Sequence, residues 1–203
     1  MDVISLDIPD LLLLSPKKFS DERGFFSETY REKWFVDQGL PINFVQDNHA
    51  RSTQEGVLRG LHFQYGDAAQ SKLIRVVRGA ILDIAVDIRH GSPTFGKYVS
   101  VTLSDENWQQ LFVPHGFAHG YYTLTAETEV IYKVDQYYTP DKEASLLWSD
   151  PTLNINWPCG ENDPILSDKD KRAPLLSEMP VYFRYDPRAK PFSVVHAPQT
   201  EIS

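Results

Sequence analysis

Cysteine is almost absent from this sequence, because Cys159 is the only one among 203 residues. A framework of intramolecular disulfides is therefore excluded, and the composition fits a reducing compartment. Long apolar runs are absent as well, since no stretch approaches the roughly 18 residues that a membrane-spanning helix requires. The leucine run at 11–14 is short and follows acidic rather than basic residues, which argues against a signal peptide. We expect a cytoplasmic protein with no membrane partner.

Positive charge is also in short supply. The chain has 20 lysines and arginines against 28 aspartates and glutamates, which gives a net charge of −8. This charge opposes binding to nucleic acid, so we expect no such partner, and an anionic ligand would need a local basic pocket. A length of 203 residues is enough for one domain with a sizeable core. We expect that domain over residues 1–180, with a tail over 181–203 that packs on the domain or is partly flexible.

Alternation of apolar and polar side chains predicts β-strands through most of the chain. Residues 82–89 have the two-residue period of a strand, with leucine, isoleucine and valine at every second position. Further short segments of this kind lie at 97–103, 110–114, 120–125 and 128–137, and residues 1–18 are typical of an edge strand. Helix signals are limited to 32–39 and 167–177. The chain is therefore expected to be an all-β sandwich or barrel with short peripheral helices, one near the C-terminal end.

The stretch from Gly56 to Lys72 holds the densest set of reactive side chains. It contains Arg59, His62 and Lys72, which supply a guanidinium, an imidazole that titrates near neutral pH and a primary ammonium. Its glycines disfavour a helix. A single histidine in a strand is more often a core residue, but its grouping with two cations favours a functional one. We expect this stretch to form one wall of an active site.

Residues 114–119 read PHGFAH, a PxGxxH pattern that resembles the second motif of the cupin superfamily, whose fold is a jelly-roll barrel. Gly56 stands at the distance before His62 that the first cupin motif requires. Metal-binding cupins present several histidines and a carboxylate to the ion, whereas this chain offers His62 and His119, with Gln64 in a ligand position. A neutral amide is a poor ligand for a transition metal. We therefore expect a cupin-type jelly-roll barrel without a metal.

Further segments narrow the resemblance. FSDERGFFSE, QDNHA, VLRGLHFQ, SKLIRVVRGAILDIAVDIR, SPTFGK, FVPHGFAHGY, IYKVDQYYTPDKE and LSDKD occur in this order. Together they resemble the dTDP-4-dehydrorhamnose 3,5-epimerase family of the rhamnose pathway, over about residues 3–180. The family's substrate is a 4-keto-6-deoxyhexose on dTDP, in which C3 and C5 both flank the C4 ketone. The resemblance implies isomerisation of dTDP-4-dehydro-6-deoxyglucose to dTDP-4-dehydrorhamnose through an enolate, without a cofactor.

Four residues match the family's catalytic positions. The resemblance implies that His62 removes the proton and that Asp170 orients the imidazole. Lys72 would stabilise negative charge on the C4 oxygen. Tyr132 would return a proton from the opposite face. Asp83 is a further candidate to orient a catalytic side chain.

The resemblance also implies a set of binding residues. Arg59 and Lys169 match a diphosphate clamp, and Tyr138 matches a residue that stacks on the thymine base. Arg23 and Glu28 match positions that reach the site of a neighbouring subunit, which implies a homodimer. The full set of expected binding residues is Phe19, Arg23, Glu28, Gln46, Asp47, Asn48, Arg59, His119, Tyr138, Glu143 and Lys169.

Several alternatives stay open on the sequence alone. An enzyme that epimerises only C3 or only C5 would carry the same residues, and a metal-dependent cupin enzyme or a non-catalytic sugar-nucleotide binding module are more distant possibilities. Gln46 and Asn48 share one strand face, and they either contact a ligand or bond to backbone. Outside the resemblance, Arg23 and Glu28 read as parts of a solvated turn.

Overall fold

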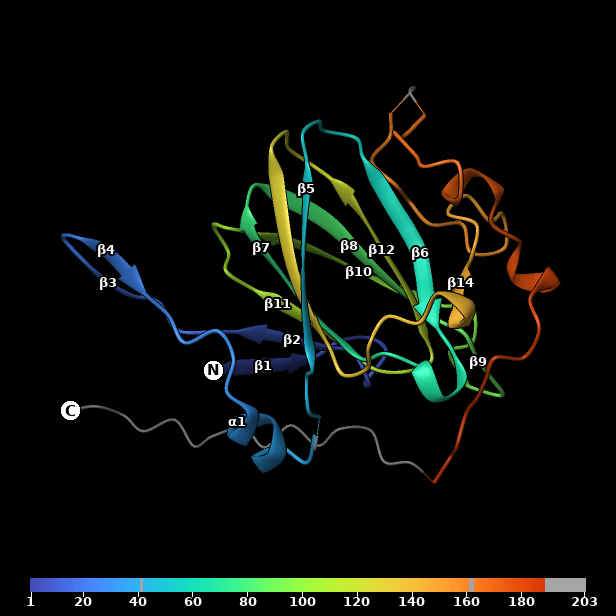
Figure 1. Cartoon of the computed structure of the whole chain (residues 1–203), viewed down its shortest axis with the longest axis horizontal. Coiled ribbons are helices and arrows are strands. Elements are labelled where there is room, and N and C mark those ends of the chain that lie inside the picture. Colours follow the sequence, from blue (N-terminus) through green and yellow to red (C-terminus); the bar gives the residue numbers. More distant parts are fainter. Residues whose placement is uncertain (41, 161–162, 189–203) are drawn as a thin grey trace.

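The computed structural model describes residues 1–40, 42–160 and 163–188. Two antiparallel sheets face each other across an apolar core (Figure 1). The larger sheet has the order β1 (Asp2–Ser5), β2 (Leu12–Ser15), β11 (Gln110–Val113), β7 (Lys72–Arg78), β13 (Thr128–Val134) and β5 (Gln46–Ser52). The smaller sheet has the order β10 (Tyr98–Ser104), β8 (Ala80–Asp87), β12 (Phe117–Thr123), β6 (Leu58–Gln64) and β14 (Glu143–Ser145). The expected all-β architecture is confirmed, with residues 2–15 at the edge of the larger sheet.

The core between the sheets is built from alternate residues of the strands. Ile74 and Val76 of β7 belong to the same buried cluster as Ile81 and Ala85 of β8. Burial of an isoleucine or valine side chain contributes roughly 1.5–3 kcal/mol, so this cluster stabilises the contact between the two sheets. The site described below lies in the same space, where polar side chains replace apolar ones.

Strand β8 has an unexpected orientation in this arrangement. Its period-two pattern is confirmed, but Ile84 and Val86 face outward, where they pack in a second cluster with Leu146 and Leu153. The segment after β14 therefore covers the outer face of the smaller sheet. As a result, the other face of β8, which carries Asp83, is turned toward the interior of the sandwich.

The helix expected at 32–39 is confirmed as α1 (Glu32–Asp37), but the helix expected at 167–177 is wrong. That segment forms two separate 3₁₀ turns, η3 (Asp170–Arg172) and η4 (Leu176–Glu178). Pro174 lies between them, and Ala173 before it has the extended backbone that a following proline imposes (φ −64°, ψ 146°). The expected role of Ser167 as the helix N-cap is wrong as well, because η3 begins at Asp170 with Lys169 at its N-cap and no side-chain cap bond. The Ser167 hydroxyl nevertheless accepts the N–H of Asp170 at 3.2 Å.

Two segments lie outside the sandwich. The hairpin of β3 (Phe19–Asp21) and β4 (Gly24–Phe26) projects away from the sheets in Figure 1, and its turn at 21–24 agrees with the sequence. β15 (Phe183–Arg184) pairs in parallel with β9 (Arg89–His90), so the first tail residues pack on the domain. Residues 189–203 of the tail are outside the described part of the chain.

Short 3₁₀ turns η1 (Gly66–Ala68) and η2 (Pro140–Lys142) complete the described elements. Within the described ranges, no helix has the length and apolarity needed to cross a membrane.

Candidate active site

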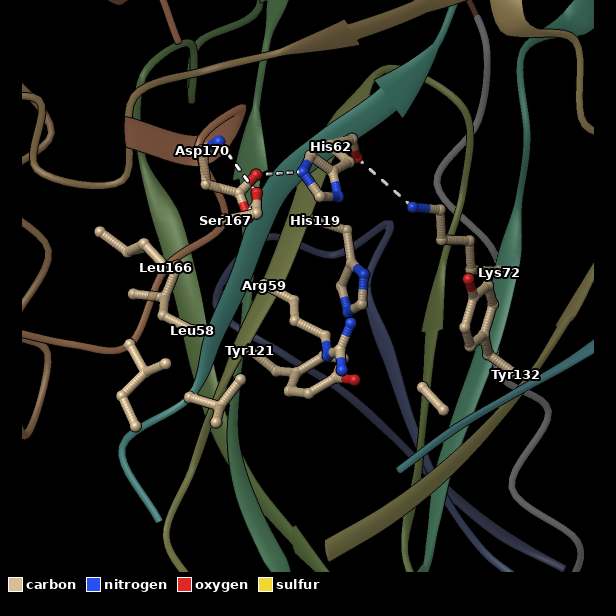
Figure 2. A pocket seen from close by; sticks show the side chains of 13 residues that line it. Leu58, Arg59, His62, Lys72, His119, Tyr121, Tyr132, Leu166, Ser167 and Asp170 are labelled. Carbon is tan, nitrogen blue, oxygen red and sulfur yellow. Dashed lines mark hydrogen bonds and ion pairs between the residues drawn. The ribbon is translucent and has the colours of Figure 1, made fainter. Parts of the chain in front are cut away.

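A cavity of about 400 Å³ lies between the sheets. The smaller sheet lines it with Arg59, His62 and His119, and the larger sheet lines it with Lys72 and Tyr132. An adjoining cavity of about 290 Å³ shares His62, Lys72 and Tyr132. Figure 2 shows these side chains directed into one common space. All four residues predicted as catalytic meet here, since Asp170 also lines the larger cavity.

Arg59 and His62 both face the cavity, although they are three residues apart in β6. In a regular strand this spacing places two side chains on opposite faces. The pairing of β6 with β12 resolves the conflict, because His119 pairs with His62 and Tyr121 pairs with Arg59. Two steps along β12 therefore match three steps along β6, so β6 carries one extra residue and forms a β-bulge. The bulge turns Arg59 to the side on which His62 lies.

Glycines allow the two strands to meet closely at this bulge. Gly60 has a φ of +130°, and a Cβ added there would lie 2.6 Å from the Cα of Gly120. A Cβ added at Gly120 would lie 2.7 Å from the carbonyl oxygen of Arg59. Both distances are shorter than van der Waals contact. Any other residue at Gly60 or Gly120 would separate β6 from β12 and displace the side chains that enter the cavity.

The His62 imidazole is held by a buried carboxylate. Its Nε2 donates a hydrogen bond to Oδ1 of Asp170 at 2.5 Å, and the Ser167 hydroxyl donates to Oδ2 at 2.8 Å. Burial opposes ionisation of Asp170, but the hydrogen bonds from His62 and Ser167 lower its pKa below the ordinary value, so it is ionised at neutral pH. Because Nε2 is engaged by this carboxylate, Nδ1 is the ring nitrogen left to face the cavity (Figure 2).

Lys72 is a buried cation beside His62. Its Nζ donates to the carbonyl oxygen of His62 at 3.4 Å, and its side chain lines both cavities. Burial lowers the pKa of Lys72 to about 8, although the negative charges of Asp83 and Glu143 act in the opposite direction. The ammonium form still predominates at neutral pH, which provides a fixed positive charge inside the cavity.

Tyr132 faces His62 from the opposite sheet. It belongs to β13 of the larger sheet, whereas His62 belongs to β6 of the smaller one. Burial raises the pKa of the Tyr132 phenol, while the positive charge of Arg59 partly offsets this effect. The phenol is therefore protonated at neutral pH and can donate a proton. The cavity thus has an imidazole on one side and a protonated phenol on the other.

His119 forms a second pair between histidine and carboxylate. Its Nε2 donates to Oδ1 of Asp83 at 2.5 Å, and both side chains are buried. Burial lowers the pKa of His119, and the Asp83 carboxylate opposes that shift. The expectation that Asp83 orients a side chain of the site agrees with this contact.

The adjoining cavity is lined mainly by polar side chains. Gln46 donates to Oδ1 of Asn48 at 2.8 Å, and its own oxygen accepts the backbone N–H of Tyr138 at 3.3 Å, so it bonds both to Asn48 and to the backbone while lining this cavity. The Tyr138 hydroxyl donates to Glu143 at 3.0 Å, and Lys169 pairs with the same carboxylate at 2.6 Å. Hydrogen bonds from Lys169 and Tyr138 lower the pKa of Glu143 against the effect of burial. Lys169 thus adds positive charge at the edge of this cavity.

Four predicted binding residues lie away from both cavities in this chain. Asp47 points to the outer face of β5, where it pairs with Lys133 at 2.8 Å. Arg23 bonds to Asp21 at the tip of the hairpin, and Glu28 pairs with Arg31 at 2.6 Å. The fourth is Phe19, which is 62% exposed on the same hairpin. A role for these residues in ligand binding stays a prediction.

Gln64, which occupies a metal-ligand position in the cupin frame, bonds to the backbone. Its amide nitrogen donates to the carbonyl oxygens of Ala68 and Tyr137, and its oxygen accepts the N–H of Thr139 at 2.6 Å. These bonds join β6 to the loop before β14. Within the described ranges, no group of three or more histidine, cysteine, aspartate or glutamate residues is arranged to hold a metal ion.

Two residues of the site were not predicted from the sequence. Ser167 donates to Asp170, and Tyr121 lines the larger cavity beside Arg59. A signal existed for Tyr121, because it lies two residues after His119 and so shares a strand face with it. Ser167 was expected only as a helix cap.

Comparisons with known proteins agree with this geometry. A model of the dTDP-4-dehydrorhamnose 3,5-epimerase family matches residues 5–178. A protein of that name from Sinorhizobium fredii is 51% identical over 181 residues, which is 89% of this chain and 92% of the relative. An epimerase from Legionella pneumophila, solved with dTDP-4-keto-L-rhamnose, superimposes with a TM-score of 0.87 at 46% identity, covering 91% of this chain and 98% of that one.

A structure with a different stated activity is similar as well. A 3'-monoepimerase from Streptomyces bikiniensis, solved with dTDP-quinovose, has a TM-score of 0.79 at 35% identity and covers 85% of this chain and 86% of that one. The overall architecture is therefore shared by proteins named for one and for two epimerisations. The expected cupin-type jelly-roll fold is confirmed by these structural matches.

Proposed function

The chain belongs to the dTDP-4-dehydrorhamnose 3,5-epimerase family, and we propose that it inverts C3 and C5 of dTDP-4-dehydro-6-deoxyglucose with His62, Tyr132, Lys72 and Asp170. The observation that carries this proposal is the placement of a base and a proton donor on opposite sheets, with the buried cation of Lys72 reaching from β7 to the backbone of His62 in β6. Epimerisation requires a proton to leave one face of the sugar ring and another to arrive at the opposite face.

In this mechanism, Nδ1 of His62 removes the proton from the carbon next to the ketone. The imidazolium that forms is stabilised by Asp170, whose carboxylate already accepts the Nε2 proton. Tyr132 then donates its phenolic proton to the other face of the carbon. Both carbons flank the same ketone, so one enolate oxygen position serves both steps.

Lys72 stabilises the enolate. Negative charge develops on the C4 oxygen when the neighbouring proton leaves, and an ammonium that is fixed in a buried cavity stabilises that charge strongly. The low exposure of Lys72, 9%, means that little water screens the interaction. This electrostatic role fits a reaction that involves no net oxidation or reduction.

The substrate's nucleotide is bound by the remaining polar groups. Arg59 is the guanidinium available to the diphosphate in the larger cavity, and Lys169 adds charge at the adjoining one. Tyr138, with 53% of its surface exposed, offers a ring face to the base. Gln46, Asn48, His119 and Glu143 supply hydrogen-bonding groups to the sugar and nucleoside.

Deuterium incorporation tests the proposed reaction. The enzyme is incubated in deuterated water with dTDP-4-dehydro-6-deoxyglucose, and the product is analysed by NMR. We expect deuterium at both C3 and C5. Label at only one carbon would favour the second candidate, a mono-epimerase. The similarity to the 3'-monoepimerase from Streptomyces bikiniensis supports this candidate. A product that carries no label at C3 and none at C5 would refute both candidates.

We also propose a cytoplasmic homodimer in which Arg23 and Glu28 reach the neighbouring site. The hairpin that carries Arg23 projects from the sheets, and its Phe19, Phe25 and Phe26 are exposed by 62%, 53% and 70%. Such aromatic exposure is typical of a surface that contacts another protein. A single cysteine and a nucleotide-linked substrate support the cytoplasmic location.

A further inference from the structure

Tyr121 is a buried phenol in the active-site cavity to which the mechanism above gives no role. It lies in β12 of the smaller sheet and is only 5% exposed. Its Cα partner across the β-bulge is Arg59, and Figure 2 shows the side chains of these two residues close together in the cavity. Burial raises the pKa of Tyr121 to about 12, so the hydroxyl keeps its proton under all conditions in which the enzyme would work.

The guanidinium of Arg59 reaches across the cavity from the smaller sheet to the larger one. Its Nε donates to the hydroxyl of Ser52 at 3.4 Å, and one terminal nitrogen donates to the carbonyl oxygen of Arg51 at 3.3 Å. Both acceptors lie at the end of β5. These are long hydrogen bonds, and by themselves they hold the guanidinium weakly.

Tyr121 adjoins the same polar group. Tyr121 pairs with Arg59 across the two strands, and both side chains line the larger cavity, where Figure 2 shows them next to each other. A hydrogen bond with the Ser52 side chain and the positive charge of Arg59 both lower the pKa of the Tyr121 phenol against the larger effect of burial. Arg59, Ser52 and Tyr121 thus form a cluster that joins β6, β5 and β12 at one side of the cavity. The phenol ring also occupies the space beside the guanidinium and limits the positions that it can take.

We propose that Tyr121 is a positioning residue for Arg59. Together with Ser52, it holds the guanidinium in the orientation that receives the substrate's diphosphate. This inference rests on the proposed role of Arg59 as the diphosphate ligand. A guanidinium that is fixed before binding loses less conformational freedom when it forms paired hydrogen bonds to phosphate oxygens, so Tyr121 improves affinity without touching the reacting carbons.

The two tyrosines of the larger cavity should therefore respond in different ways to loss of the hydroxyl. For Tyr121→Phe we expect a KM about 3- to 10-fold higher, the effect of one neutral hydrogen bond, with kcat within about twofold of wild type. For Tyr132→Phe we expect a large fall in kcat with the affinity for dTDP unchanged. Tyr122→Phe is a matched control, because Tyr122 is the next residue in β12 and lines neither cavity.

Calorimetric titration with dTDP separates a positioning role from a general structural one. Tyr121→Phe should weaken binding about 3- to 10-fold in an otherwise wild-type chain, but should add nothing in an Arg59→Ala background. A merely structural effect would be additive, and melting temperatures identify it. Ser52→Ala is the second variant, and we expect the same dependence on Arg59.

Each result has a definite meaning. Weak dTDP binding by Arg59→Ala, combined with unchanged binding by Tyr121→Phe and Ser52→Ala, would overturn this inference alone. Unchanged binding by Arg59→Ala would refute the diphosphate role and the inference with it. A fall in kcat for Tyr121→Phe as large as that for Tyr132→Phe would also overturn it, because the phenol would then act on the reacting atoms. Failure of the wild-type chain to bind dTDP or to epimerise would refute the proposed function itself.

Discussion

Replacing Lys72 with methionine should abolish epimerisation and at the same time stabilise the fold. The reason is that the ammonium is buried, which lowers its pKa to about 8. A charged lysine that would prefer water makes the folded state less stable wherever it is protonated. Methionine has a similar length and carries no charge, so it can occupy the same space between the sheets.

The size of the effect follows from the two pKa values. The folded-state pKa of about 8 lies below the ordinary value of 10.5, and each pH unit corresponds to about 1.36 kcal/mol. Lys72 therefore lowers the free energy of unfolding by about 3 kcal/mol when it is charged in both states. Between the two pKa values the unfolded chain binds more protons, so stability rises with pH in that window. Above pH 10.5 the lysine is neutral in both states and the cost disappears.

Urea unfolding of wild type and Lys72→Met at two pH values measures this effect. At pH 7 we expect the variant to be more stable by about 3 kcal/mol, and at pH 9.5 by about half of that. Lys17→Met is the control, because Lys17 is exposed and its replacement should leave the free energy of unfolding nearly unchanged at both values. A variant less stable than wild type, or a difference that does not decline with pH, would refute the argument.

Two further predictions concern the site. Asp170→Asn removes the charge that stabilises the His62 imidazolium, and a hydrogen bond to a charged group contributes about 1.5–3 kcal/mol, so kcat/KM should fall by roughly 10- to 150-fold. Asp168→Asn, at a side chain with 85% exposure, should have little effect in the same assay, and equal losses in both variants would contradict the role of Asp170. For the homodimer, mixing Arg23→Ala with His62→Ala after joint refolding should restore activity, because a mixed dimer has one site with both residues intact. Mixtures no more active than the separate variants would contradict the shared site.

The four residues that we propose for the reaction could be named from the sequence, since His62, Lys72, Tyr132 and Asp170 each match a motif, and all four line one cavity. Their convergence depends on long-range pairing between β6, β7 and β13, which no local pattern encodes. The resemblance to a family supplied this information. The side chains themselves indicated only a base and two cations in one segment.

Three features of the fold could be recognised only in the structure. The β-bulge at Gly60 cannot be read from alternation, because one extra residue reverses the face of everything before it in the strand. Alternation also did not reveal which face of β8 points into the sandwich, since Ile84 and Val86 pack outward against the segment after β14. Capping signals at Ser167 predicted a helix, but the restriction that Pro174 imposes on Ala173 prevailed.

His62 and Tyr132, the two groups that we propose for proton transfer, lie on different sheets, and this separation has a mechanical consequence. The separation of the two sheets, and with it the distance from His62 to Tyr132, depends on the volume of the side chains packed between them, such as Ile74 and Ala85. Protein interiors are close-packed, so a change of one methylene in that core alters the spacing between the layers. Substitutions remote from the sugar could thereby weaken one proton transfer more than the other. The volume of the core thus helps to determine which sugar rings can contact His62 and Tyr132 at the same time.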